Sequence, residues 1–120
     1  MEKNQTWLNK GEGELSLDIF EDEKQLIVKA PIAGTKPEDL NVSINNDLLT
    51  IQGERRLEEV EEKNCLYQEC FWGKFSRSVI LPVEVKAQGI KAFLKDGILT
   101  IVLSKTKQTK SKVIKVKNEE

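Results

Sequence analysis

The most constraining feature of this chain is the stretch Ile90–Leu103, IKAFLKDGILTIVL, in which two alternating apolar runs meet at Asp96-Gly97. Asp-Gly between such runs predicts a tight β-hairpin, because glycine accepts the positive φ angle that the turn requires. The second run is apolar on both faces, with Leu99, Ile101 and Leu103 on one face and Ile98 and Val102 on the other. A strand of this kind is typical of the interior of a sheet. The stretch therefore predicts that other strands pack around this hairpin.

The rest of the chain repeats the pattern of short strands separated by turn residues. We expect further strands at 15–19, 26–30, 40–44, 49–51 and 75–81, a short extra strand at 65–71, and one helical turn at Pro37. The charged segment 54–64 has helical propensity but no apolar stripe, so a charged loop with at most one helical turn is expected there. These elements predict an all-β, immunoglobulin-like β-sandwich of about seven to eight strands.

The composition excludes several functional classes. A chain of 120 residues is long enough for one ordinary core. Its net charge of −1 argues against a nucleic-acid binder, since such proteins usually carry a basic excess. It contains no histidine, which removes the commonest general base and the commonest metal ligand. We therefore expect no enzyme, no cofactor, no metal and no small-molecule substrate.

The sequence also predicts a cytoplasmic protein that does not bind membranes. No apolar run approaches the roughly 18 residues that a spanning helix needs, and the first 14 residues lack the apolar core of a signal peptide. The two cysteines, Cys65 and Cys70, are too few for a disulfide scaffold and fit a reducing compartment. Five residues apart, they lie on opposite faces of an extended strand, which disfavours an internal disulfide and leaves an intersubunit or redox role open.

Several stretches match a known family. They are APIAG followed by KPEDL, LLTIQGER (Leu48–Arg55), YQECFWGKFSRSVILP (Tyr67–Pro82), the hairpin above, and Ile114-Lys115-Val116 in the tail. In this order and spacing the chain resembles the small heat-shock proteins of the bacterial or archaeal type, whose shared unit is the α-crystallin domain (Hsp20 family). On this basis the expected domain spans residues 15–104, between a flexible arm (1–14) and a flexible C-terminal extension (105–120).

The resemblance implies an ATP-independent holdase, a chaperone that binds unfolding client proteins and prevents their aggregation. It also implies a homodimer in which a strand of the long loop adds to the partner's sheet. An edge strand with unpaired backbone groups is a template for such pairing. The implied interface comprises Leu66, Tyr67 and Glu69 of the loop, the accepting strand with Leu15, Leu17 and Ile19, and Arg77 nearby. If Arg77 faces inward it needs a carboxylate partner, for which Glu69 or an acid of the charged loop is a candidate; the alternative is an ordinary surface arginine.

The resemblance further implies that Ile114 and Val116 of the tail fill a groove on their own or a neighbouring subunit. The implied walls are Val42, Ile44, Ile90, Ala92 and Leu94. The alternative is that the two residues merely end a frayed tail. The arm is shorter than is usual in the family, which favours a dimer or a small oligomer.

Two questions stay open at this point. Trp7 and Leu8 of the arm either pack on the domain's own surface or contact a partner or client, and Phe93 is a further candidate client contact. The competing function is a co-chaperone-type adaptor that docks onto other chaperones. The long loop and the I-x-V tail argue against it, and a strictly monomeric protein would favour it.

Overall fold

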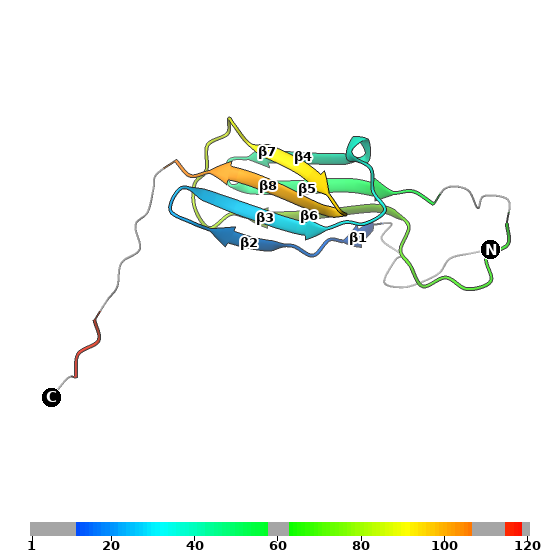
Figure 1. Ribbon diagram of the computed structural model, residues 1–120, viewed down its shortest axis with the longest axis horizontal. Coiled ribbons are helices and arrows are strands. Elements are labelled where there is room, and N and C mark those ends of the chain that lie inside the picture. The colour runs from blue at the N-terminus through cyan, green and yellow to red at the C-terminus, as the bar shows by residue number, and fades with distance from the viewer. Residues whose placement is uncertain (1–11, 58–62, 107–114, 119–120) are drawn as a thin grey trace.

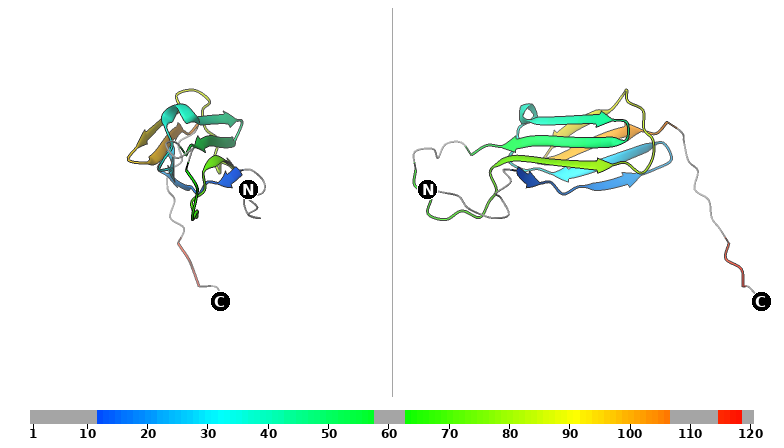
Figure 2. Two further views of the ribbon diagram at one scale, coloured as in Figure 1. Left: turned by 90° about the vertical axis from the view of Figure 1, so that its right-hand side faces the viewer. Right: turned by 180° about the vertical axis from the view of Figure 1, so that it is seen from behind.

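The computed structural model describes residues 12–57, 63–106 and 115–118, and eight strands lie in these ranges. They form two stacked four-stranded sheets (Figures 1 and 2). Sheet A has the order β1 (Glu12–Glu14), β6 (Gly73–Ile80), β5 (Leu48–Arg55), β4 (Leu40–Asn45). Sheet B has the order β2 (Asp18–Glu21), β3 (Gln25–Pro31), β8 (Ile98–Ser104), β7 (Lys91–Lys95). The predicted all-β sandwich is confirmed, and the turn expected at Pro37 is the 3-10 helix η2 (Pro37–Asp39).

The core lies between the two sheets and is built from alternate residues of the central strands. The fully buried large side chains are Leu26, Val28, Ile32, Leu49, Ile51, Ile101 and Leu103. Because successive side chains of a strand point to opposite faces, this alternation assigns one face of β3, β5 and β8 to the core. The hydrophobic pattern read from the sequence is therefore the one that the sandwich buries.

The Asp96-Gly97 hairpin has the predicted form. Asp96 and Gly97 have φ angles of 53° and 77°, as a two-residue turn with both central residues at positive φ requires. The turn pairs Lys95 with Ile98, and β8 lies between β3 and β7. The hairpin therefore joins an interior strand, β8, to an edge strand, β7.

One close contact in sheet A requires glycine. A Cβ atom at Gly53 would lie 2.6 Å from Cζ of Phe75 and 2.8 Å from Cδ2 of Leu40. Both distances are shorter than any normal carbon–carbon contact, so the Phe75 ring occupies the space that a side chain would take. This glycine belongs to the LLTIQGER stretch, which explains in packing terms why that stretch contains it.

The strands at the N-terminal end differ from the sequence prediction in two respects. The expected strand 15–19 is interrupted: residues 15–17 link β1 to β2, because the chain crosses here from sheet A to sheet B. In addition, β1 lies inside the predicted arm and pairs in parallel with β6. Residues 12–14 therefore pair with sheet A, and Leu15, the first residue of the predicted domain, is buried in the link.

Two further boundaries differ from the prediction. Residues 65–71, predicted as a short extra strand, form no strand in this structure. At the C-terminus, Lys105 is buried beside Glu21, at an Nζ–Oε2 distance of 3.5 Å, and its amide donates to the Lys24 carbonyl. The packed domain therefore extends past Ser104.

The turn between β2 and β3 is closed by Asp22. Its Oδ1 accepts hydrogen bonds from the backbone amides of Lys24 and Gln25, each at 2.8 Å. These two bonds hold the pKa of Asp22 below its ordinary value, because they stabilise the ionised carboxylate. Asp22 thereby fixes the end of the edge strand β2.

Candidate functional site

The strand order leaves β2 at one margin of sheet B and β7 at the other. β2 is short, and an edge strand has backbone N–H and C=O groups that face outward and can pair with another chain. Ile19 in β2 and Leu17 before it are half-buried against the core, and Leu15 is only 6% exposed. Of the three residues predicted to line the accepting strand, only Ile19 lies within β2.

The described residues that lead from the β5–β6 loop into β6 extend beyond the end of both sheets (Figure 1). Among them, residues 63–70 are all exposed, Leu66 at 93% and Tyr67 at 81%. The Tyr67 hydroxyl donates to Oε2 of Glu69 at 2.9 Å. Residues two apart share a side in an extended chain, so this bond is compatible with a strand-like conformation of the segment. The loop thus holds apolar side chains away from its own core.

Arg77 lies on β6 and is half-buried. Its Nη1 donates to the Leu15 carbonyl oxygen at 2.8 Å, which ties the link between β1 and β2 to sheet A. Glu69, one of the carboxylates considered for this arginine, instead accepts the hydrogen bond from Tyr67. Glu54, the first acid of the charged segment, lies 3.6 Å from Arg56 through its Oε1. The remaining acids of that segment, at 58–62, lie outside the described residues.

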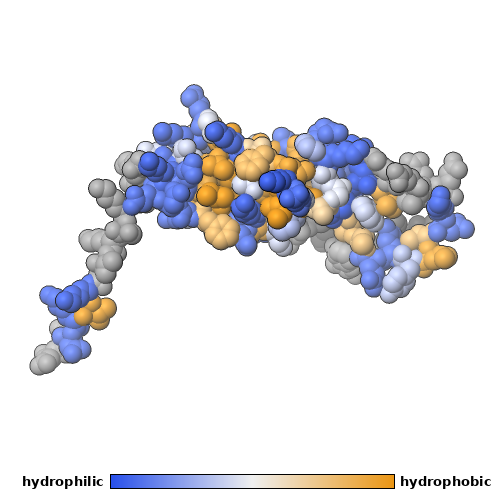
Figure 3. Space-filling view, viewed as in Figure 1, coloured by the Kyte–Doolittle hydropathy of each residue, from blue (hydrophilic) through white to orange (hydrophobic). Residues whose placement is uncertain are grey.

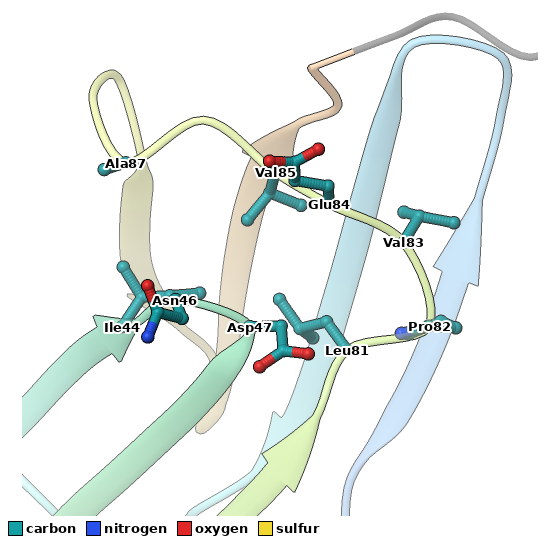
Figure 4. Close-up of a pocket in the computed structure, with 9 residues that line it drawn as sticks. All are labelled: Ile44, Asn46, Asp47, Leu81, Pro82, Val83, Glu84, Val85 and Ala87. Carbon is teal, nitrogen blue, oxygen red and sulfur yellow. The ribbon is translucent and has the colours of Figure 1, made fainter.

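The opposite margin of the sandwich carries β4 and β7, the edges of the two sheets. Four of the five predicted groove residues, Val42, Ile44, Ile90 and Leu94, are half-buried against the core, and Ala92 is exposed. At one end of this margin a cavity of about 540 Å³ opens between the β4–β5 turn and the segment that precedes β7 (Figure 4). It is lined by Ile44, Asn46, Asp47, Leu81, Pro82, Val83, Glu84, Val85 and Ala87.

Of the tail motif, the structure describes Val116 but not Ile114. Val116 is 90% exposed. Trp7 and Leu8 of the arm also lie outside the described residues.

The outer face of sheet B carries apolar residues that the sequence interpretation mostly missed. Phe20, Phe93 and Ile98 are 55%, 52% and 40% exposed. Phe20 pairs with Ile27, and Ile27 with Val102, so these three side chains form a row across three strands. Figure 3 shows apolar side chains over the middle of this face. Of these residues only Phe93 was predicted as a contact, although alternation in β2 also points Phe20 outward.

The described residues can also be compared with the requirements of a metal site, a disulfide and a membrane span. No group of three or more His, Cys, Asp or Glu among them is placed to hold a metal ion. Cys65 and Cys70 are free thiols on the exposed loop. Within the described ranges, no helix is long and apolar enough to cross a membrane.

Comparison with known proteins gives consistent matches. The sequence model of the Hsp20/alpha crystallin family matches residues 18–117. The chain is 34% identical over 100 residues to small heat shock protein C4 of Rickettsia felis, covering 82% of this chain and 61% of that protein. It is 34% identical over 109 residues to heat shock protein 16 of Schizosaccharomyces pombe, covering 87% and 76%. The chain spans 61% and 66% of the length of the two Rickettsia felis relatives that it matches.

Solved structures agree with the sequence matches. Heat shock protein 16.0 from Schizosaccharomyces pombe superposes with a TM-score of 0.77 at 32% identity, covering 88% of this chain and 100% of that one. A small heat-shock protein from Xylella fastidiosa, whose structure is described as having a distinct high order structure, gives a TM-score of 0.68 at 31% identity, covering 87% and 96%.

Proposed function

Because the chain belongs to the Hsp20/alpha crystallin family of small heat shock proteins, we propose that it is an ATP-independent holdase. It binds unfolding proteins in the cytoplasm, prevents their aggregation, and acts as a strand-exchanged dimer or a larger oligomer. It performs no catalysis and needs no cofactor. Its partners are its own copies and its clients, rather than nucleic acid, membranes or small molecules.

The observation that carries the proposal is that one chain has both an open edge strand and an exposed segment that could pair with such an edge. β2 is an edge strand, and the segment Leu66–Glu69 is exposed beyond the sheets of its own chain. In a symmetric dimer each copy adds this segment to the partner's β2, which satisfies backbone groups on both sides. Leu66 and Tyr67 would lose their solvent exposure there, and Arg77 would support the accepting edge from β6.

The tail supplies a second, weaker contact. Ile114 and Val116 occupy the groove between β4 and β7 of a neighbouring subunit or of their own. The eleven residues from Leu103 to Ile114 reach about 35 Å when extended. Two small apolar side chains contribute about 2–4 kcal/mol at most, and ordering the tail removes part of that. The contact is therefore reversible.

Clients are proposed to contact the outer face of sheet B together with the arm. Phe93 lies on this face with Phe20 and Ile98, and exposed apolar side chains of this kind bind the apolar segments that unfolding proteins expose. Trp7 and Leu8 supply further apolar contacts from the arm.

The proposal is tested by heating an aggregation-prone client with and without the protein, in the absence of ATP, and following light scattering. We expect suppressed scattering at an equimolar ratio. Unchanged scattering at excess protein would refute the holdase. A protein that is also monomeric at micromolar concentration by size-exclusion chromatography would point instead to the adaptor.

A further inference from the structure

Two side chains act at the base of the long loop. Arg56, the first residue after β5, is bound to Asp39 of η2, and Arg55 reaches the other end of the loop. Arg55 ends β5 and pairs with Gly73, the first residue of β6. Its Nε donates to the Ala33 carbonyl at 2.9 Å, and its Nη1 donates to the Phe71 carbonyl at 3.2 Å. Its guanidinium lies 5.8 Å from the centroid of the Phe75 ring. One side chain thus connects the end of the loop, the turn before η2 and the core of sheet A.

These bonds act where strand pairing stops. The β5–β6 ladder ends at Arg55 and Gly73, and Gly73 has a φ of 133°, a conformation that residues with a side chain rarely adopt. Phe71 lies two residues beyond the ladder, and its carbonyl is fixed by the guanidinium. A charged donor makes a stronger hydrogen bond than a neutral one, and the rigid guanidinium directs its N–H groups along fixed, divergent lines. A lysine ammonium does not reproduce that geometry.

We infer that Arg55 is a positioning residue for dimer formation. It sets the direction in which the loop leaves the sandwich, so that Leu66–Glu69 points where a partner's β2 can receive it. This inference rests on the strand exchange of the proposed function. When the base of the loop is loose, only a fraction of molecules present the segment correctly, and the apparent dissociation constant rises by the inverse of that fraction. A symmetric dimer contains two such loops, so each of the two copies raises the apparent dissociation constant in this way.

The test compares Arg55→Met and Arg55→Lys with Lys74→Met as a matched control. Lys74 is exposed and follows Gly73, so its replacement removes one positive charge from the same end of the sandwich. All variants carry Trp7→Phe, which leaves Trp72, next to Phe71, as the sole tryptophan. Sedimentation velocity gives the dimer dissociation constant, and fluorescence anisotropy of Trp72 in the dilute monomer reports order at the base of the loop. A merely structural role would lower the unfolding midpoint without changing either quantity at 25 °C.

We expect both Arg55 variants to raise the dissociation constant about tenfold or more, equivalent to about 1.4 kcal/mol, and to lower the Trp72 anisotropy. Lys74→Met leaves both unchanged. Unaltered dimerisation in Arg55→Met, or an equal loss in Lys74→Met, would overturn the inference. If Arg55→Met does not fold, Arg55→Lys decides by the same criteria. If the parent protein does not dimerise, the strand exchange fails; unchanged Trp72 anisotropy in the Arg55 variants then refutes the anchoring separately.

Discussion

Leu66→Ala is expected to weaken the dimer while leaving the stability of the folded monomer unchanged. Leu66 is 93% exposed in the single chain, so its side chain contributes almost nothing to the core. Its truncation removes three carbon atoms, and at about 0.8 kcal/mol for each buried methylene the loss is roughly 2 kcal/mol for each copy that becomes buried. A symmetric dimer buries two copies. The dissociation constant should therefore rise by about thirtyfold for partial burial and about a thousandfold for full burial.

Sedimentation velocity across a concentration series measures the dissociation constant, and urea unfolding of the dilute protein measures monomer stability. Leu48→Ala is the matched control, because Leu48 is 38% exposed and begins β5 at the end opposite to the loop. This control should leave the dissociation constant unchanged. If Leu66→Ala dimerises as tightly as the parent protein, Leu66 is not buried between subunits and the strand-exchange reasoning is wrong.

Three further outcomes follow from the tail, the sheet packing and the edge turn. Replacing Ile114 and Val116 together by alanine should reduce any assembly larger than a dimer to dimers, measured by native mass spectrometry; an unchanged mass would show that the tail holds nothing together. Gly53→Ala should lower the free energy of unfolding by about 1–3 kcal/mol, because its methyl group would overlap the Phe75 ring; urea unfolding at the parent's stability would contradict that packing. Asp22→Ala should destabilise the protein at neutral pH. Because the native pKa of Asp22 lies below the ordinary 3.8, its contribution is present above that value and is lost as the pH falls through the native pKa. Urea unfolding of both proteins between about pH 2 and pH 7 should therefore converge at the acid end, and a constant difference would refute the assignment.

The parts of the fold that the sequence predicted are those in which local chemistry and burial agree. The hairpin is one case, since Asp96-Gly97 specifies the turn and alternation specifies the face that β8 buries. β3, β4 and β5 were predicted equally well from the sequence, because each alternates apolar and polar residues between turn residues. In each of these elements the pattern needs only near neighbours to be interpreted.

The errors arose where distant contacts decide the structure. The alternation of Leu15, Leu17 and Ile19 suggests one strand, yet the chain crosses between sheets there and the Leu15 carbonyl is bound by Arg77, 62 residues away. Lys105 is buried, although the lysine-rich composition of the segment that it begins suggests a solvated tail. Its ammonium group forms an ion pair with Glu21.

The candidate site likewise contains parts that the sequence predicted and parts that depend on distant contacts. The half-buried groove residues follow from alternation in β4 and β7, and the exposed loop follows from its charge. The base of that loop was not predicted, because Arg55 meets Ala33 and Phe71 only after β5 and β6 have paired. Phe20 was missed as a surface residue because its β2 neighbour Ile19 was the one assigned to the interface.

The most direct test of the strand exchange is amide hydrogen exchange measured as a function of protein concentration. In the single chain, residues 66–69 are exposed and belong to no strand, and β2 is an edge strand. We predict that both segments become protected together as the dimer forms, while the β4–β5 turn keeps a constant exchange rate. A dimer in which residues 66–69 exchange as fast as in the dilute monomer would contradict the exchange of strands between subunits.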